Sequence, residues 1–419
     1  MKIVIVGAGK VGVALTRHLA VENRVTVIDQ NPHLVENIIN IYDVMGVCGN
    51  GASYDVQKEA DVEQADLLIA TTSSDEINIL TCLVAKKMGV QHTIARIRSP
   101  EYGRQLRFMR SELGLSMAIN PEAATAREIA RVLRFPTAMK LESFSKGRLE
   151  LVEYRVAEHT ALDGTRLSEL YRNFKVRVLI CAVARQGETI IPSGDFTLRA
   201  GDKIYLTAAP RELEKFFRLL GVFRARASSV MIVGASKMCY YLASERLEMG
   251  MSVKIIDQNE QRCVEMSEKL PRALVIVGDG TDSELLSEEG ISQTDAFVAI
   301  TGLDEANILM ALSAAKQSGD CCKVVAKINR KSLLELVSTE SLIDSVVSTG
   351  AVTTELILQY IRAMKNASAS KVKTLHRIVD EKVEALEFSV TPDISFAGVP
   401  LRDPVSYTHL RAHETRSNL

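Results

Sequence analysis

The feature that most constrains this chain is a glycine turn between a short apolar run and a helix near the N-terminus. Ile3–Val6 is apolar, Gly7-Ala-Gly-Lys-Val-Gly12 follows, and after an amphipathic helix a second apolar run, Val25–Ile28, ends on Asp29. This order of strand, Gly-x-Gly-x-x-Gly, helix, strand and acid is the pattern of a dinucleotide-binding βαβ unit. All the context that the motif requires is present, so we predict nucleotide binding here and not an ordinary turn.

Each glycine of the turn meets a different physical need. Gly7 permits the tight turn, Gly9 lets a pyrophosphate approach the backbone, and Gly12 lets the helix pack closely on the strand. An amphipathic helix follows the turn, and its N-terminus, near Lys10 and Val11, presents free N–H groups and a partial positive charge to the phosphates.

The acid at the end of the second strand indicates which cofactor fits. Asp29 lies 17 residues beyond Gly12 (29 − 12), where a carboxylate can accept hydrogen bonds from both hydroxyls of the adenosine ribose. Its charge would repel a 2′-phosphate, and no Arg follows at once to accept one. The sequence therefore favours NAD or NADH over the phosphorylated cofactor.

Length and composition indicate a globular protein of several domains. A chain of 419 residues is too long for one ordinary core, so two to four domains are expected. The net charge of −1 gives no general attraction to nucleic acid or anionic lipid. The seven cysteines show no metal-binding spacing, and we interpret them as reduced, small hydrophobic side chains. No apolar run approaches the roughly 20 residues of a membrane span, and no signal peptide precedes the first strand, so we expect a cytoplasmic protein.

Residues 1–135 alternate between predicted strands (3–6, 25–28, 44–47, 67–70, 93–97 and 117–119) and helices (among them 32–39, 54–60, 76–88, 102–113 and 122–133). Six strands with five crossovers predict an α/β domain with a doubly wound parallel sheet. Its ligand crevice should lie over the C-terminal ends of the strands. The candidate cofactor-binding residues at this edge are Gly7, Gly9, Lys10, Val11, Gly12, Asp29, Gln30, Gly51, Thr72, Asp75, Asn78 and Arg96.

A small α+β module is predicted over residues 139–222. Leu149–Val156 largely alternates between apolar and polar residues, as a half-buried strand does. Further strands are expected at 176–185, 189–191 and 202–208, and a helix at 210–220.

The opening pattern restarts at Ser229 and predicts a second Rossmann-like domain over residues 228–365. The offset between the copies is 228 for the acids (257 − 29) and 229 for the Asp-Glu-x-Asn-Ile-Leu segment (304 − 75). Repetition this dense indicates gene duplication and suggests a pseudo-two-fold arrangement. A second, incomplete module is expected at 371–403. Residues 404–419 fit no repeat, so we expect a truncated or foreign C-terminus there, without a metal site at His409 and His413.

The second glycine turn departs from the pattern of the first. Ser236 and Cys239 replace the second and third glycines, whereas Asp257 survives and joins the candidate binding residues. A β-carbon at position 236 would crowd a pyrophosphate, and Cys239 would weaken close helix packing. We expect weaker or altered nucleotide binding in this half, such as binding of a mononucleotide, with an unliganded structural copy as the alternative.

Taken together, the motifs resemble the TrkA family, the regulatory subunits of bacterial Trk potassium uptake systems, which are built from tandem RCK domains. The resemblance covers residues 1 to about 403, and the segments that carry it are 5–12, 71–78, 95–102 and 304–308. It implies a homo-oligomer, a dimer or a tetrameric ring, that lies at the cytoplasmic face of the plasma membrane as a peripheral partner of a potassium-translocating Trk subunit. It also implies NAD(H), or ATP and ADP, as the regulatory ligand.

The same resemblance implies roles for individual residues. The three glycines would hold the phosphates, Asp29 the ribose, and Thr72, Asp75 and Asn78 would line the crevice. Arg96 would reach a phosphate, with a plain surface cation as its alternative. For Asp75 and Asn78 the alternative is a helix cap and a polar helix face.

Two functions compete for this sequence. A regulator needs a nucleotide that binds differently to two domain arrangements. An NAD-dependent oxidoreductase needs a His, Lys or Tyr that transfers a proton near the nicotinamide, and neither small module supplies one, since His159 is isolated in a polar segment. We therefore predict a regulator and no enzyme. An RCK subunit of another cation channel would differ only in its partner.

Overall fold

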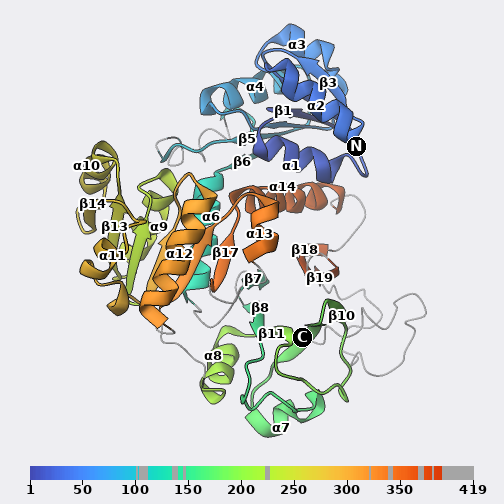
Figure 1. Cartoon of the computed structure of the whole chain (residues 1–419). Helices are drawn as coiled ribbons and strands as arrows, with labels where there is room; N and C mark the ends of the chain where they lie inside the picture. Colours follow the sequence, from blue (N-terminus) through green and yellow to red (C-terminus); the bar gives the residue numbers. More distant parts are fainter. Residues whose placement is uncertain are drawn as a thin grey trace. The chain divides into compact units, whose positions relative to one another are not determined.

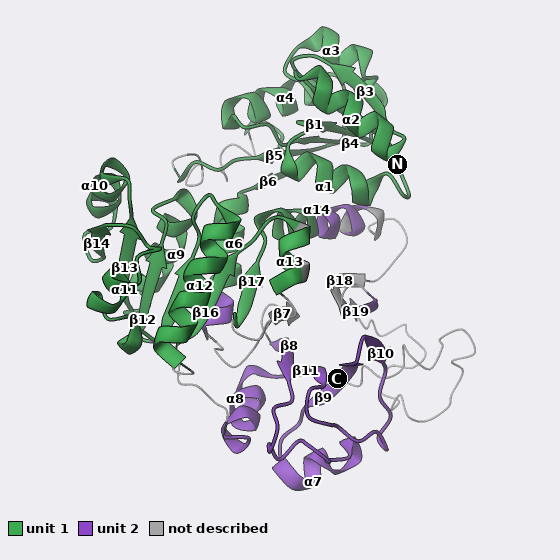
Figure 2. Cartoon of the chain, in the orientation of Figure 1, with its two compact units in different colours: residues 1–130, 228–357 green, residues 131–227, 358–419 purple. Residues whose placement is uncertain are grey.

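The structure is a computed structural model, and the residues that it describes are 1–100, 102, 112–134, 140–144, 148–221, 227–319, 322–337, 343–366, 372–379 and 382–388. Most of the helix predicted at 102–113 and the whole tail, 404–419, lie outside them. The chain forms two compact units (Figure 2), residues 1–130 with 228–357 and residues 131–227 with 358–419. The first unit thus holds both Rossmann sheets, and the domain boundaries drawn from the sequence stay predictions.

The first sheet is parallel and six-stranded, in the order β3-β2-β1-β4-β5-β6 (Figure 1). Its strands are β1 (Lys2–Val6), β2 (Arg24–Asp29), β3 (Met45–Cys48), β4 (Leu67–Ala70), β5 (His92–Arg96) and β6 (Met117–Ile119). The strand order reverses between β1 and β4, which places a crevice above their C-terminal ends. This confirms the doubly wound α/β fold, with each predicted strand within one residue of its observed bounds.

Helices connect these strands because apolar residues recur on one face of each. They are α1 (Lys10–Leu19), α2 (Pro32–Tyr42), α3 (Tyr54–Glu59), α4 (Asp75–Lys87) and α6 (Pro121–Arg134), with a 3₁₀ turn η1 (Val62–Gln64). Ile3–Val6 of β1 and all of β4 are apolar and buried, as in a sheet that is covered on both faces. Val4, Val6, Leu68 and Ala70 pack with Cys82 and Ala85 of α4 in one core cluster.

The second sheet repeats the first, in the order β14-β13-β12-β15-β16-β17. Its strands are β12 (Ser229–Val233), β13 (Ser252–Asp257), β14 (Leu274–Val277), β15 (Ala296–Ala299), β16 (Lys323–Lys327) and β17 (Ser345–Val347). The helices are α9 (Lys237–Glu248), α10 (Glu260–Lys269), α11 (Ser283–Glu288), η4 (Ile291–Gln293), α12 (Asp304–Ser318), α13 (Lys331–Val337) and α14 (Thr349–Asn366). The duplication read from the sequence is therefore a duplication of the whole sheet.

The second unit contains an antiparallel sheet in the order β10-β9-β11-β8-β7. Its elements are β7 (Lys140–Phe144), β8 (Leu149–Arg155), η3 (Leu167–Glu169), α7 (Leu170–Phe174), β9 (Leu179–Arg185), β10 (Glu188–Ile190), β11 (Lys203–Ala208) and α8 (Pro210–Leu219). Residues of α7 and α8 pack in one core cluster with the sheet. The sequence did not predict β7, because its short polar-rich stretch, KLESF, has only two apolar residues to indicate a strand.

A hairpin of β18 (Val372–Ile378) and β19 (Val383–Phe388) belongs to the same unit. Val379, Val383 and Ala385 pack with Leu151 of β8 and Tyr205 of β11. The start of the predicted second module thus contacts the sheet of the first module. In the described part of the chain, no helix has the length and apolar character needed to cross a membrane.

Candidate functional site

The glycine turn brings helix α1 against the ends of β1 and β4. Gly7 has φ +104°, and a β-carbon there would lie 2.9 Å from the carbonyl carbon of Thr71. A β-carbon on Gly12 would lie only 1.8 Å from the Gly7 oxygen, so no side chain fits without a shift of the backbone. A β-carbon on Gly9, in contrast, would meet no heavy atom within 4 Å. The space above Gly9 is therefore open to a ligand.

The N-terminus of α1 faces this open space without a cap. Gly9 is the N-cap residue, and no side chain accepts a hydrogen bond from the first turn. Lys10 is exposed and Val11 is buried. Because the first N–H groups of a helix have no partner within the helix, an uncapped N-terminus binds anions. The predicted phosphate position is thus formed by Gly9, Lys10, Val11 and Gly12.

Asp29 is held in place by two backbone N–H groups. Its Oδ2 accepts a hydrogen bond from Ala8 N at 2.6 Å, and its Oδ1 accepts one from Asn31 N at 2.9 Å. Each carboxylate oxygen has a second lone pair, which leaves it able to accept from a ribose hydroxyl. Gln30 follows as an exposed residue. The carboxylate is thus fixed beside the glycine turn, as the sequence pattern requires.

Gly51 brings the loop after β3 against β1. A β-carbon on Gly51 would lie 2.1 Å from Cγ1 of Val6. Its oxygen accepts a hydrogen bond of 2.7 Å from Nε2 of Gln57, a side chain that is completely buried. Gly51 therefore lets the loop after β3 approach β1 closely.

Asn78 binds the backbone at the ends of two neighbouring strands, β4 and β5. Its Oδ1 accepts from Thr72 N and from Thr72 Oγ1, both at 2.8 Å, and its Nδ2 donates to the oxygens of Thr72 and Arg96. Asp75 uses Oδ2 in the same way, accepting from Arg98 N at 2.9 Å and from Ser99 N at 2.8 Å. Both side chains are buried, so they hold the loops that form the crevice. The helix cap is Ser74, whose Oγ accepts from Ile77 N.

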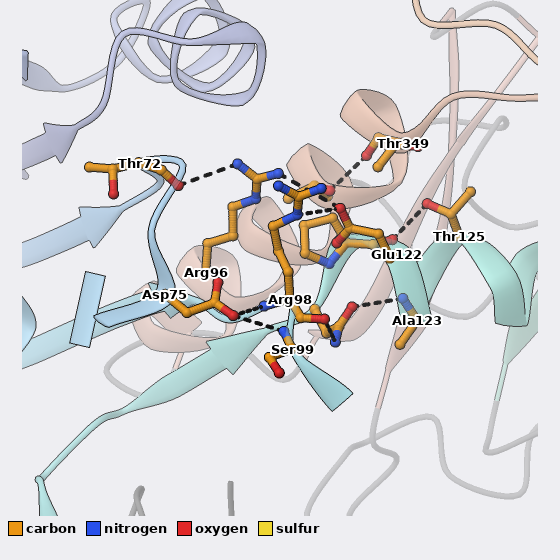
Figure 3. Close-up of polar contacts among 12 residues, drawn as sticks. Thr72, Asp75, Arg96, Arg98, Ser99, Glu122, Ala123, Thr125 and Thr349 are labelled. Carbon is orange, nitrogen blue, oxygen red and sulfur yellow. Dashed lines mark hydrogen bonds and ion pairs between the residues drawn. The ribbon is translucent and has the colours of Figure 1, made fainter. Parts of the chain in front are cut away.

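Arg96 and Arg98 converge on one buried carboxylate (Figure 3). Glu122, in the first turn of α6, accepts from Arg98 Nε at 2.6 Å and lies 3.9 Å from Arg96 NH2. Arg96 also donates to the Thr72 oxygen at 3.4 Å, and burial lowers the pKa of its guanidinium, an effect that the Glu122 charge opposes. The sequence did not single out Glu122, because its partners precede it by 24 and 26 residues (122 − 98, 122 − 96).

Three buried polar atoms of this cluster have no hydrogen-bond partner among the described residues. They are Arg96 Nε, Glu122 Oε2 and Asp75 Oδ1. Native structures rarely leave such atoms without a partner. The cluster thus contains one donor, on Arg96, and two acceptors, on Glu122 and Asp75, that are buried without a partner among the described residues.

The second sheet repeats this framework with different residues at its rim. Asp257 accepts from Ala235 N at 2.7 Å and Asn259 N at 2.9 Å, as Asp29 does from its own neighbours. Lys327 stands where Arg96 stands, and its Nζ donates to the Ile300 oxygen at 3.4 Å. Burial lowers the pKa of Lys327, while Asp304 and Glu122 favour its charged form. Asp257 thus belongs to the glycine turn of the second sheet, whereas the other predicted residues belong to the first sheet.

Helix α9 of the second repeat contacts the segment 98–130 of the first repeat. Asn120 donates to the Tyr241 hydroxyl at 2.8 Å, and that hydroxyl donates to the Arg98 oxygen at 3.3 Å. Further along, Arg246 of α9 is 2% exposed and donates to the Ala130 oxygen. The segment that carries Arg98 and Glu122 therefore also holds helix α9 of the second repeat.

The fold and its two crevices define a duplicated Rossmann protein with an added α+β module. The model of the TrkA-N domain matches residues 3–121 and 230–349, and that of the TrkA-C domain matches residues 151–221. These matches cover more than half of the chain, so the protein belongs to the TrkA family. The resemblance drawn from the motifs is confirmed.

Several curated relatives match along most of their length. The chain is 32% identical over 409 residues to Trk system potassium uptake protein trkA homolog 1 of Methanosarcina mazei. This match covers 96% of this chain and 98% of that protein. It is 34% identical over 391 residues to Trk system potassium uptake protein TrkA of Vibrio alginolyticus, covering 92% and 84%.

Solved structures share the fold at low sequence identity. The GsuK channel bound to NAD gives a TM-score of 0.64 at 21% identity, and the match covers 87% of this chain and 64% of that one. The gating ring of human SLO3 gives 0.50 at 12% identity, with 91% and 88% covered. At these identities the likeness concerns the fold alone, and it agrees with the predicted pair of Rossmann-like domains.

Proposed function

We propose that this protein is a nucleotide-sensing regulatory subunit that controls potassium uptake through a Trk-type membrane subunit. The observation that carries the proposal is the uncapped helix N-terminus above Gly9, next to the fixed carboxylate of Asp29. These two features suit the phosphates and the ribose of one nucleotide. The relatives' names, which specify potassium uptake, support the physiological role.

The ligand is NAD or NADH, with ATP or ADP as the alternative. The Asp29 carboxylate favours a free ribose 2′-hydroxyl, and the same two features would serve the adenosine half of either class. Lys10 and Arg96 add positive charge on the phosphate side. We keep Gly7, Gly9, Gly12, Asp29, Gly51 and Arg96 as direct or close neighbours of the ligand, whereas Thr72, Asp75 and Asn78 shape the crevice through the backbone.

The contacts around Glu122 give the ligand a route to the second repeat. A phosphate near Arg96 would compete with Glu122 for the guanidinium. The same short segment holds Tyr241 of α9 through Asn120 and the Arg98 oxygen. A nucleotide that changes the Arg96–Glu122 contact would also change the contact of this segment with α9. Its affinity would then differ between two arrangements of the repeats, which is the condition for regulation.

The protein acts as a homo-oligomer, a dimer or a ring of four, at the cytoplasmic face of the membrane, where it contacts the potassium-translocating subunit. It is a regulator and not an oxidoreductase. The relatives' names, which specify potassium uptake proteins, favour a regulator, and His159 is an exposed loop residue with φ +61°. An enzyme would consume NADH with a carbonyl substrate, whereas a regulator binds NADH and leaves it unchanged.

The test is calorimetric titration of the full chain with NADH, NAD⁺, ATP and ADP, beside the variants Asp29→Ala and Asp257→Ala. We expect a site that Asp29→Ala weakens at least about 10-fold, equivalent to roughly 1.4 kcal/mol. A difference between NADH and NAD⁺ would make the protein a redox sensor. Absence of binding by all four nucleotides would overturn the sensing function, and steady NADH oxidation would overturn the assignment as a regulator.

A further inference from the structure

The two glycine turns differ in how their own residues use the N-terminus of the following helix. Above α1 the N-cap is Gly9, which has no side chain and leaves the first turn uncapped. Above α9 the N-cap is Ser236, and its Oγ accepts a hydrogen bond from Cys239 N at 3.3 Å. In the second repeat the protein therefore supplies an acceptor where the first repeat leaves room for a phosphate oxygen.

A second donor of the turn is also occupied in the second repeat. Ser236 N donates to the Gly234 oxygen at 2.9 Å. Among the described residues, Gly9 N makes no equivalent bond to Gly7. Two of the N–H groups that would face a pyrophosphate, those of Ser236 and Cys239, are thus satisfied from within the turn.

The space for the pyrophosphate differs as well. A β-carbon at Gly9 would enter open space, with no protein atom within 4 Å, and in the second repeat the Cβ and hydroxyl of Ser236 lie at this position. Cys239 occupies the position that Gly12 has in the first repeat. There, a β-carbon on Gly12 would lie only 1.8 Å from the Gly7 oxygen. Because Cys239 is completely buried, α9 and its turn cannot keep the close spacing that Gly12 permits.

The charge beside the second glycine turn also disfavours an anionic ligand. Asp279 occupies the position of Asn50, at an offset of 229 (279 − 50). Hydrogen bonds from Thr281 and Gln258 lower its pKa, so it carries a negative charge that Asn50 lacks. An anionic ligand thus meets repulsion at the second crevice and none from this position at the first.

From these differences we infer that Ser236 and Cys239 close the second crevice to the pyrophosphate of a dinucleotide, so that each chain binds one dinucleotide, in the first crevice. Asp257 keeps its two backbone donors, which shows that the turn is altered at its phosphate end and not at its ribose end. Only the first repeat then binds the dinucleotide and changes its position, and it moves relative to the second repeat. This inference rests on the proposed function for nucleotide binding in the first crevice, whereas the closure of the second crevice by Ser236 and Cys239 is tested separately.

The test is titration calorimetry of the full chain with NADH. We expect one site per chain, weakened at least about 10-fold by Asp29→Ala and unchanged by Asp257→Ala. The double variant Ser236→Gly/Cys239→Gly should gain a second site, and adding Asp257→Ala to it should remove that site. The mirror variant Gly9→Ser should weaken the first site about 10-fold, because it introduces the cap that Ser236 forms.

Several results would overturn the inference. These are two NADH sites in the unmodified chain, a single site that depends on Asp257, or a folded double variant that gains no site. If the unmodified chain bound no nucleotide, the proposed function would fail, and the double variant would still decide whether these two residues close the crevice. A thermal melt by circular dichroism checks that each variant folds. Should the double variant fail to fold, Ser236→Gly alone must gain a weak second site, and no gain would count against the inference.

Discussion

The Nδ2 atom of Asn78 donates a hydrogen bond of 2.9 Å to the backbone oxygen of Arg96, which ties the start of α4 to the end of β5. The second repeat contains the same contact between Asn307 and the Lys327 oxygen, at 2.8 Å. Both Asn side chains are completely buried and also bind the loop after the preceding strand. The two crevices thus share the same brace, an Asn side chain that joins a helix to the neighbouring strand.

Replacing this brace should destabilise the fold. Asn78→Ala removes four hydrogen bonds and leaves buried backbone groups without partners, so we expect a loss of about 2–4 kcal/mol in the free energy of unfolding. Urea denaturation measures it. Asn307→Ala is the matched control, with a similar loss of stability but unchanged affinity of the first crevice for NADH. A loss of stability below about 1 kcal/mol for both variants would show that the surrounding loops keep their conformation without the Asn side chain.

Substitutions of Gly12 and Gly9 should differ in their effects on stability and on nucleotide binding. Gly12→Ala places a β-carbon against the Gly7 oxygen, so we expect a loss of about 1–3 kcal/mol of stability together with weaker nucleotide binding. Gly9→Ala meets open space and should cost only about 0.5 kcal/mol of stability, while its methyl group obstructs the phosphates. Thermal unfolding and calorimetry on both variants provide the comparison. Equal stability of the two would contradict the close approach of α1 to the turn.

Glu122→Gln should change stability and affinity in opposite directions. The variant removes the charge that holds Arg96 and Arg98, which are partly exposed, so the loss of stability should be about 1–3 kcal/mol. It also frees the Arg96 guanidinium for a phosphate, so NADH should bind several-fold more tightly. Denaturation and titration measure the two effects. Weaker NADH binding in Glu122→Gln would mean that Glu122 supports the ligand and does not compete with it.

The cysteines provide a probe of the first crevice. Cys48 is exposed and is paired in register with Asp29, whereas Cys82 and Cys239 are buried and burial raises the pKa of both thiols. Iodoacetamide should therefore label Cys48 in the folded protein and the other two only after unfolding. A bound nucleotide at Asp29 should slow the labelling of Cys48, as read by peptide mass spectrometry. No protection at saturating NADH would place the ligand away from β2 and β3.

Acid should weaken the second repeat through Asp295. Burial alone would raise the pKa of Asp295, but hydrogen bonds from Ser228 and Ser229 outweigh it and lower the pKa below the ordinary value. A lowered folded pKa gives stability that is complete above the unfolded value of about 3.9 and is lost as the pH falls through the folded value. Asp295→Asn should thus lose stability at pH 7, and its difference from the unmodified chain should shrink below about pH 4.

The matched control for Asp295 lies in the first repeat. Asp66 stands at the equivalent position and accepts a hydrogen bond from Lys2 N at 2.7 Å, whereas Asp295 accepts four from Ser228 and Ser229 through one oxygen. We expect a smaller effect for Asp66→Asn in the same urea titrations. An equal effect would show that the serine hydroxyls add nothing to the contact.

The sequence by itself determined the architecture of the Rossmann units. Apolar runs bounded by glycine and acidic residues specify buried parallel strands, and the spacing from Gly7 to Asp29 specifies the crevice between them. These features are local, since they depend on side-chain periodicity and on the backbone freedom of single glycines. The duplication was equally visible, because both copies keep the same residues at nearly constant offsets. Among the described residues, the strands β7 and β18 escaped this kind of prediction.

The tertiary structure decided what the polar residues of the crevice do. Asp75 and Asn78 have the same place in the motif as ligand-binding residues, and only the fold shows that their side chains bind the backbone. Glu122 forms ion pairs with Arg96 and Arg98. Asn120 donates a hydrogen bond to the hydroxyl of Tyr241, which lies 121 residues further along the chain. The physical reason is that a buried polar group takes whichever partner packing brings to it, and such partners come from distant parts of the chain that no local pattern records.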